Sequence, residues 1–145
     1  QLKGVDSTKR VSSAKLGPGA TIVIKEKIMT HGHQTAETSF DVSLDGAGSS
    51  AKLISRSVAR DFSRQLFRSK IIGNTDCYGH SECDAIIMDN GVVAAEPEII
   101  ANHVDASLVH EAAIGKIAGD QLVKLMTLGL TEKEAEAQII NGFLK

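Results

Sequence analysis

The sequence predicts a mainly β protein, a parallel β-helix followed by a C-terminal α-helical hairpin. Strand-like runs separated by Gly, Asn, Asp and Ser fill the chain from residue 20 to about residue 117, and only 3% of the residues are aromatic. Stacked coils build a thin core from small and β-branched side chains, whereas sandwich cores usually contain large aromatics. A β-sandwich of seven strands is the structural alternative. Helical spacing begins after residue 117, so we expect a β-helix core domain over 1–117 and a helical segment over 118–145.

Several of the predicted strands alternate between apolar and polar residues. Phe40, Val42 and Leu44 fall on one face of their run, with Asp41 and Ser43 on the other. This period of two is typical of a strand that is buried on one side only. The predicted strands are 20–29, 38–44, 51–58, 65–72, 83–88, 91–95 and 104–112.

The C-terminal segment carries helix signals. Asp120 is predicted to cap a first helix that Gly129 closes. Thr131 and Glu134 have the spacing of a capping box at the start of a second helix. The apolar stripe of this second helix either packs on the β-domain, the more common outcome, or docks a partner. The apolar residues of the first helix are Leu122, Val123, Leu125 and Met126, and those of the second are Ala135, Ile139, Ile140 and Phe143.

Composition excludes several classes of protein. The formal net charge is −2, with acids and bases interspersed, which argues against a nucleic-acid-binding protein. No apolar run reaches the roughly 18 residues that cross a bilayer, so we expect a cytoplasmic protein without a membrane partner. Phosphate-binding glycine loops are absent, which argues against nucleotide hydrolysis by this chain.

Cys77, His80 and Cys83 form a cluster of residue types that bind zinc or iron. The spacing of the cysteines is not that of a zinc knuckle or a ferredoxin loop. Strand alternation would also place neighbouring ligands on opposite faces. A structural zinc module therefore stays an alternative, beside the simpler interpretation of Cys83 as a buried, inert thiol.

His110 and Glu111 are adjacent near the end of the last predicted strand. Alternation puts His110 on the face of Ala106 and Leu108 and puts Glu111 on the opposite face, so one of the two points inward. A buried ionisable group needs a partner, a metal or a neutral state. The simpler interpretation is a hydrogen-bonded core histidine beside a solvated glutamate.

Acidic residues also keep a carbohydrate-active β-helix enzyme, a hydrolase or lyase, among the alternatives, because paired carboxylates serve that chemistry. Against it, the chain has few aromatic residues on which sugars could stack. The candidate carboxylates are Asp76, Glu82, Asp84 and Asp89.

Ordered motifs over residues 70 to 145 resemble the C-terminal half of the SufB and SufD proteins, the scaffold subunits of the SUF iron–sulfur cluster assembly machinery. The residues of the His-Glu-Ala region are more similar to those of SufB than to those of SufD. The motifs are Cys83-Asp-Ala-Ile-Ile-Met, Val109-His-Glu-Ala, Lys116-Ile, Asp120-Gln-Leu, Gly129-Leu-Thr-Glu and Ile139-Ile-Asn-Gly-Phe.

The resemblance implies a right-handed parallel β-helix and a non-enzymatic scaffold. It implies that Cys83, His110 and Glu111 bind iron and a transient iron–sulfur cluster at a SufB/SufD-type interface. It also implies a SufC-type ABC ATPase as partner, docked by the C-terminal helices, and a cysteine desulfurase system as sulfur donor. The expected docking residues are Leu122, Met126, Ile139, Ile140 and Phe143.

The resemblance leaves open whether the other partner is a SufB/SufD paralogue or a second copy of this chain. Family members are usually longer, with further coils before this region. A β-helix that is cut short at its N-terminal side leaves an open coil end and exposed strand edges, so we expect a dimer.

Overall fold

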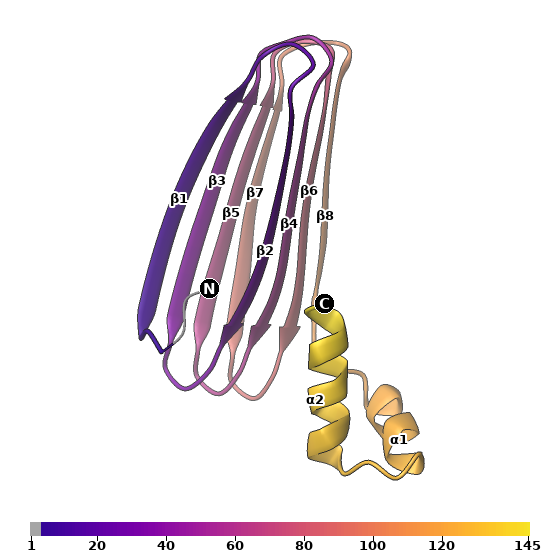
Figure 1. The fold of residues 1–145 in the computed structure, drawn as a ribbon. Coiled ribbons are helices and arrows are strands. Elements are labelled where there is room, and N and C mark those ends of the chain that lie inside the picture. Colours follow the sequence, from indigo (N-terminus) through magenta and orange to yellow (C-terminus); the bar gives the residue numbers. More distant parts are fainter. Residues whose placement is uncertain (1–3) are drawn as a thin grey trace.

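A computed structural model describes residues 4–145 as two parallel β-sheets with two helices at one end (Figure 1). One sheet has the strand order β1-β3-β5-β7 and the other has the order β2-β4-β6-β8. Consecutive strands alternate between the sheets, and each strand pairs in parallel with the strand two places along the chain, so the chain winds as a solenoid of about four turns. The predicted parallel β-helix is confirmed. The sandwich alternative is wrong, since sandwiches consist of antiparallel strands.

Most of the strands are longer than predicted, and the sequence did not predict the first of them. That strand, β1, carries small and charged residues, and as the first strand of its sheet it pairs with β3 on one edge only. The strand bounds are β1 Ser7–Leu16, β2 Thr21–Thr30, β3 Thr35–Leu44, β4 Ser49–Ala59, β5 Arg64–Gly73, β6 Cys77–Ile87, β7 Val92–Ala101 and β8 Ala106–Gly115.

Each turn of the solenoid repeats after 28 or 29 residues, as the register of paired residues shows. Inward-facing residues of successive coils therefore stack on one another. Phe40, Val42 and Leu44 are at most 2% exposed, which confirms the alternation predicted for that strand. Small residues make room for larger neighbours: a Cβ at Gly79 would come within 2.7 Å of Leu108 and 2.8 Å of Ile71.

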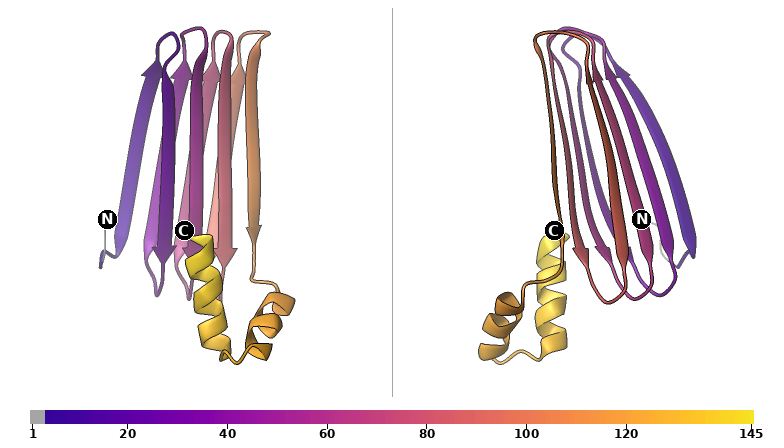
Figure 2. Two further views of the ribbon diagram at one scale, coloured as in Figure 1. Left: turned by 45° about the vertical axis from the view of Figure 1, so that its right-hand side comes forward. Right: turned by 180° about the vertical axis from the view of Figure 1, so that it is seen from behind.

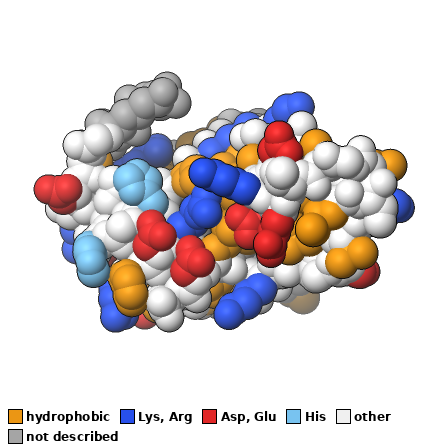
Figure 3. Space-filling view, turned by 90° about the horizontal axis from the view of Figure 1, so that it is seen from below, with side chains coloured by type: hydrophobic (Ala, Val, Ile, Leu, Met, Phe, Trp, Pro, Cys, Tyr) orange, Lys and Arg blue, Asp and Glu red, His pale blue; other side chains and the backbone are white. Residues whose placement is uncertain are grey.

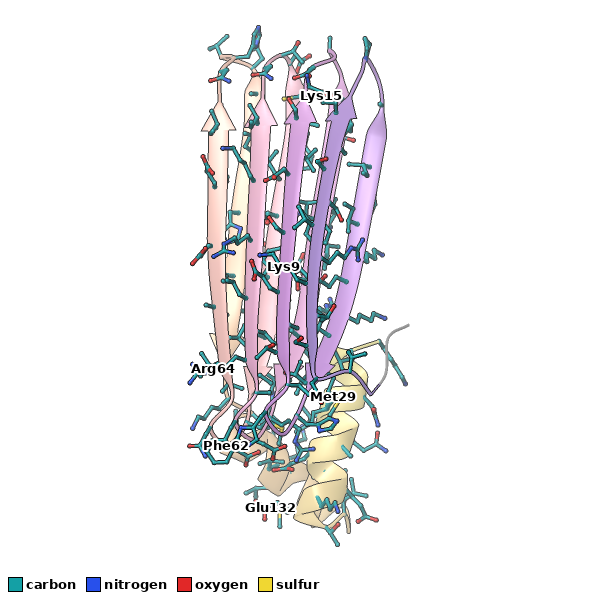
Figure 4. All side chains as sticks on the ribbon, turned by 90° about the vertical axis from the view of Figure 1, so that its left-hand side faces the viewer. Lys9, Lys15, Met29, Phe62, Arg64 and Glu132 are labelled. Atoms are coloured by element: carbon teal, nitrogen blue, oxygen red, sulfur yellow. The ribbon has the colours of Figure 1, made fainter. Side chains whose placement is uncertain are left out.

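The outer faces and the turns are polar. Lys9 and Lys15 project from the outer face of β1 (Figure 4), where they form ion pairs with Glu37 at 3.1 Å and with Asp45 at 3.6 Å. Asn74 Nδ2 donates a hydrogen bond of 2.6 Å to Asp45 Oδ1, and equivalent turns are thereby linked from coil to coil. These contacts fix the register of the turns.

The helices α1 (Gly119–Thr127) and α2 (Glu132–Phe143) follow the last strand. Asp120 was predicted to cap α1, and this is wrong: the cap is Ala118, while Asp120 lies in the first turn and its Oδ1 accepts from the Gln121 amide. Gly129 has a φ of +96° just after α1 and ends it as predicted. The capping box of Thr131 and Glu134 is confirmed.

The second helix packs on the lower end of the β2-β4-β6-β8 sheet. Ile140 is 5% exposed and lies in an apolar cluster with Val58 and Met88, and Phe143 packs against this cluster. Arg60 of the solenoid forms an ion pair of 3.8 Å with Glu136. In contrast, α1 has no buried residue, and Figure 1 shows it standing away from both sheets.

Strands β7 and β8 form the open C-terminal end of the solenoid, because each is the last strand of its sheet. Figure 2 shows β8 at the opposite side of its sheet from β2. Apolar side chains are exposed along these two strands, among them Ile99 at 38% and Ile114 at 40%. This end therefore offers both unpaired backbone groups and apolar surface.

Candidate functional site

Cys83 lies in β6 with its side chain facing the interior of the solenoid, 1% exposed. It pairs with Ser55 of β4 on one side and with Ala112 of β8 on the other. Burial, with a smaller contribution from the neighbouring Asp84 carboxylate, raises the pKa of its thiol to about 11. The thiol is therefore neutral at physiological pH unless a cation stabilises the thiolate.

His110 lies on the interior face of β8, where it pairs with Ser81 of β6. Because Cys83 is two positions beyond Ser81 on the same face, His110 and Cys83 are diagonal neighbours on adjacent strands. Burial lowers the pKa of His110, so its imidazole is neutral at pH 7, the form that binds metals. Its Nδ1 is buried without a hydrogen-bond partner. The simpler interpretation, a hydrogen-bonded core histidine beside a solvated glutamate, still accounts for the Ser81 backbone hydrogen bond of His110 but leaves Nδ1 unexplained.

Glu111 points away from Cys83 and His110. It lies on the outer face of β8, and 66% of its side chain is exposed. The alternation predicted from the sequence is confirmed, but it separates the three expected iron ligands: the thiol and one imidazole lie inside the solenoid, and the carboxylate lies outside. On that outer face Glu111 Oε2 is 3.5 Å from His80 Nε2.

The interior beside Cys83 is more polar than the sequence analysis predicted. Glu26, on the inward face of β2, is 7% exposed and accepts hydrogen bonds from Thr38 at 3.0 Å and from Ser55 at 2.9 Å. Burial raises the pKa of this carboxyl, and the hydrogen bonds partly oppose the rise. Since Ser55 pairs with Cys83, a continuous row of polar side chains runs from Glu26 to the thiol.

The alternating residue pattern of β2 could have predicted that the Glu26 side chain faces the interior. It occupies an inward position of an alternating strand, between Ile24 and Ile28. A carboxylate at such a position is expensive to bury without partners.

The zinc alternative does not fit the described residues. Cys77 and Cys83 face the interior, whereas His80 faces outward, so the three cannot bind one ion. Within residues 4–145 no group of three or more His, Cys, Asp or Glu side chains is arranged to hold a metal ion.

The carbohydrate-enzyme alternative also finds little support. Two hollows, of about 440 and 810 Å³, contain one carboxylate each, Asp41 and Glu26 respectively. A glycosidase needs two carboxylates that face each other across the substrate. Neither hollow supplies such a pair.

The expected docking residues divide into two groups. Ile140 and Phe143 pack within the chain, so the packing interpretation of this stripe holds for them, while Leu122 and Ile139 are half-buried. Met126 is 43% exposed, and two residues that were not expected, Val123 at 60% and Leu128 at 76%, are exposed with it. Figure 3 shows apolar side chains at this end of the molecule, on the side where Figure 1 places the helices.

The fold and the site together describe a parallel β-solenoid with a thiol and an imidazole on the interior face of adjacent strands. The sequence matches the family described as SUF system FeS cluster assembly, SufBD core domain, over residues 1–143. The chain belongs to this SufBD family of the iron–sulfur cluster assembly system.

Curated relatives carry the name Iron-sulfur cluster assembly SufBD family protein. The relative from Methanothermobacter thermautotrophicus is 39% identical over 105 residues, 71% of this chain and 26% of its own length. The relative from Archaeoglobus fulgidus is 31% identical over 99% of this chain and 39% of its own length. One from Pyrococcus horikoshii is 35% identical over 90% of this chain and 40% of its own length. The chain thus spans between a quarter and two fifths of these relatives.

Neither helix among residues 4–145 has the length and apolar character that a membrane crossing requires.

Proposed function

We propose that this chain is a non-enzymatic scaffold subunit that holds iron and a nascent iron–sulfur cluster at Cys83 and His110. The observation that carries the proposal is the placement of this thiol and this imidazole as diagonal neighbours on the interior face of β6 and β8, at the open end of the solenoid. Thiolate sulfur and imidazole nitrogen are ligands that iron accepts. The transient cluster is the cargo of the scaffold.

Burial of the thiol fits a site that stays closed until it is loaded. A thiol with a pKa of about 11 is a poor nucleophile and a poor ligand at neutral pH. Iron favours the thiolate over the thiol, so binding of iron releases the proton. Because β8 is paired on one side only, displacement of this edge strand would expose Cys83 and His110 together.

Glu111 would contribute a ligand to the cluster at an interface with another subunit. A hard carboxylate oxygen on the outer face of β8 can reach a cluster only if the strand moves or if another subunit covers the open end. We propose that a SufB/SufD paralogue or a second copy of this chain packs on β7 and β8, whose exposed apolar residues and free edges favour association.

A second partner, a SufC-type ABC ATPase, would dock on the exposed face of α1. Val123, Met126 and Leu128 form the apolar part of this face. ATP hydrolysis then belongs to the partner, and sulfur comes from a cysteine desulfurase system. Such chemistry uses reduced thiols, which fits a cytoplasmic location.

Anaerobic reconstitution with ferrous iron and sulfide tests the cluster site. We expect visible absorbance typical of an iron–sulfur cluster, and its loss in Cys83→Ser. Cys77→Ser is the matched control, because Cys77 is also a buried thiol of β6 but lies six positions away at the start of the strand. Equal cluster formation in both variants would contradict the proposal.

Light scattering of the chain mixed with the SufC-type ATPase of the same organism, with and without ATP, tests the docking surface. We expect a stable complex that Met126→Lys weakens at least tenfold. Val23→Lys is the control, because Val23 is an exposed position of β2 that lies outside both α1 and the β7–β8 end of the solenoid. Equal loss of binding in both variants would contradict docking on α1.

A further inference from the structure

His80 and Glu111 face each other on the outer face of the β2-β4-β6-β8 sheet. The register pairs Glu82 with Glu111 and His80 with Val109, so His80 and Glu111 are diagonal neighbours on strands β6 and β8. The 3.5 Å between His80 Nε2 and Glu111 Oε2 is longer than a good hydrogen bond. The pair is separate from Cys83 and His110, which lie on the other side of the same sheet.

The separation of the two atoms is the one that two ligands of a single metal ion would have. First-row divalent ions bind imidazole nitrogen and carboxylate oxygen at ~2.1 Å, and two such bonds at a near-tetrahedral angle put the ligand atoms ~3.4 Å apart. His80 Nε2 is also buried without a hydrogen-bond partner. A buried polar atom without a partner calls for an explanation, and a bound ion is one that fits this geometry.

The exposure of the two side chains suits entry of an ion from solvent. The His80 side chain is 13% exposed and the Glu111 side chain is 66% exposed, so the carboxylate covers the nitrogen and is free to turn outward. Glu82 and Asp84 lie on the same face, and burial together with the Glu82 charge raises the pKa of Asp84. The cations nearest the pair on this face are Lys52, opposite His80, and Arg56, opposite Asp84, and Lys25 and Lys27 lie farther away on β2.

We propose that His80 and Glu111 form an outer binding site for a divalent transition-metal ion, ferrous iron in particular, that delivers metal to this wall of the solenoid. The choice of iron rests on the proposed function, while the site itself rests on the geometry. Two protein ligands leave the other coordination positions to water or to a partner. An ion held by only two protein ligands exchanges readily, which suits an ion that is passed on. The carboxylate and imidazole on the outer face are hard and borderline ligands, whereas the Cys83 thiol on the inner face is a soft one.

Anaerobic equilibrium dialysis with Fe²⁺ tests the inference. The background is the full chain carrying Cys77→Ser and Cys83→Ser, so that no thiolate contributes. We expect this background to bind one equivalent of Fe²⁺, and His80→Gln and Glu111→Gln each to weaken binding at least tenfold. Glutamine conserves size and hydrogen bonding, and circular dichroism of each variant confirms that it is folded.

His103→Gln is the matched control. His103 Nδ1 lies 3.8 Å from Asp105 Oδ2 in an exposed turn, so it resembles the His80 pair in composition but not in burial. We expect no change in Fe²⁺ affinity. If His80→Gln and Glu111→Gln bind Fe²⁺ as the background does, the pair is an ordinary ion pair and the inference is wrong.

The same series separates this inference from the proposed function. Loss of cluster formation in Cys83→Ser with unchanged Fe²⁺ binding in His80→Gln would overturn the outer site alone. Fe²⁺ binding that depends on His80 together with normal cluster formation in Cys83→Ser would overturn the inner site alone.

Discussion

The Cys83 thiol is held in its neutral form by its surroundings. Its pKa of about 11 predicts slow alkylation by iodoacetamide at pH 7 to 8 in the folded chain, with a rate that keeps rising up to about pH 11. In urea the rate should reach its plateau about two pH units lower, near the ordinary thiol pKa of about 9. Peptide mass spectrometry of Cys83 across a pH series measures both curves. Coincident folded and unfolded curves would contradict the burial of the thiol.

Glu26 makes the free energy of unfolding depend on pH. Burial raises its folded pKa above the ordinary value of 4.5, so the folded state binds more protons than the unfolded state just above that pH. Stability contributed by this group is therefore lost as pH rises from 4.5 through the folded pKa. Glu26→Gln removes the loss, so its stability relative to wild type should increase from pH 4 to pH 7 in urea titrations.

Glu37→Gln is the control with the opposite sign. The Lys9 ammonium, hydrogen-bonded to Glu37, holds the pKa of that carboxyl below 4.5. This group stabilises the fold above pH 4.5 and loses that effect as pH falls through the folded pKa. The relative stability of Glu37→Gln should therefore increase as pH is lowered. Parallel pH profiles for the two variants would contradict both assignments.

At the scale of elements, Gly79 allows β6 to pack against Leu108 and Ile71. Gly79→Ala forces a Cβ to within 2.8 Å of both side chains, and we expect a loss of ~1–3 kcal/mol in the free energy of unfolding. Gly115→Ala is the matched control, since nothing lies within 4 Å of a Cβ at that strand position. Its effect should stay within about 0.5 kcal/mol. Urea unfolding at constant m-value compares the two.

The capping box starts α2. Thr131→Ala removes the acceptor of the Glu134 amide, which should cost ~1 kcal/mol and increase amide hydrogen exchange in the first turn of α2. Thr127→Ala is the control, because that hydroxyl donates to the Lys124 carbonyl at the end of α1 and caps no amide. Equal exchange in both variants would show that packing of Ile140, rather than the cap, holds the helix.

Alternation and capping signals made much of the fold predictable from sequence. They predicted the inward face of 40–44, the opposite orientations of His110 and Glu111, and the start of α2. They missed β1, because its inward positions before Leu16 are mostly polar or small, as Ser12 and Ala14 are, and show no apolar alternation. Alternation and capping signals also could not predict that His80 lies close to Glu111. This contact depends on the register between strands about 30 residues apart, and the stacking of the coils sets that register.

The whole molecule has an open end at β7 and β8. We expect light scattering at micromolar concentration to give the mass of a dimer, because unpaired edges and exposed apolar residues favour association. Ile114→Lys should restore a monomer. Val23→Lys, an exposed position of β2 beside the opposite end of the solenoid, should leave the dimer unchanged. A monomeric wild-type chain would contradict the prediction.

The wall between the outer and inner sites is a single layer of backbone. Burial lowers the pKa of His110 on the inner face, and the nearby imidazole of His80 on the outer face adds to this lowering. A dication held by His80 and Glu111 would act through the same layer and favour the thiolate form of Cys83. Positive charge bound on the outer face of the sheet would therefore make the Cys83 thiol on the inner face more reactive, although no atom crosses the backbone between them.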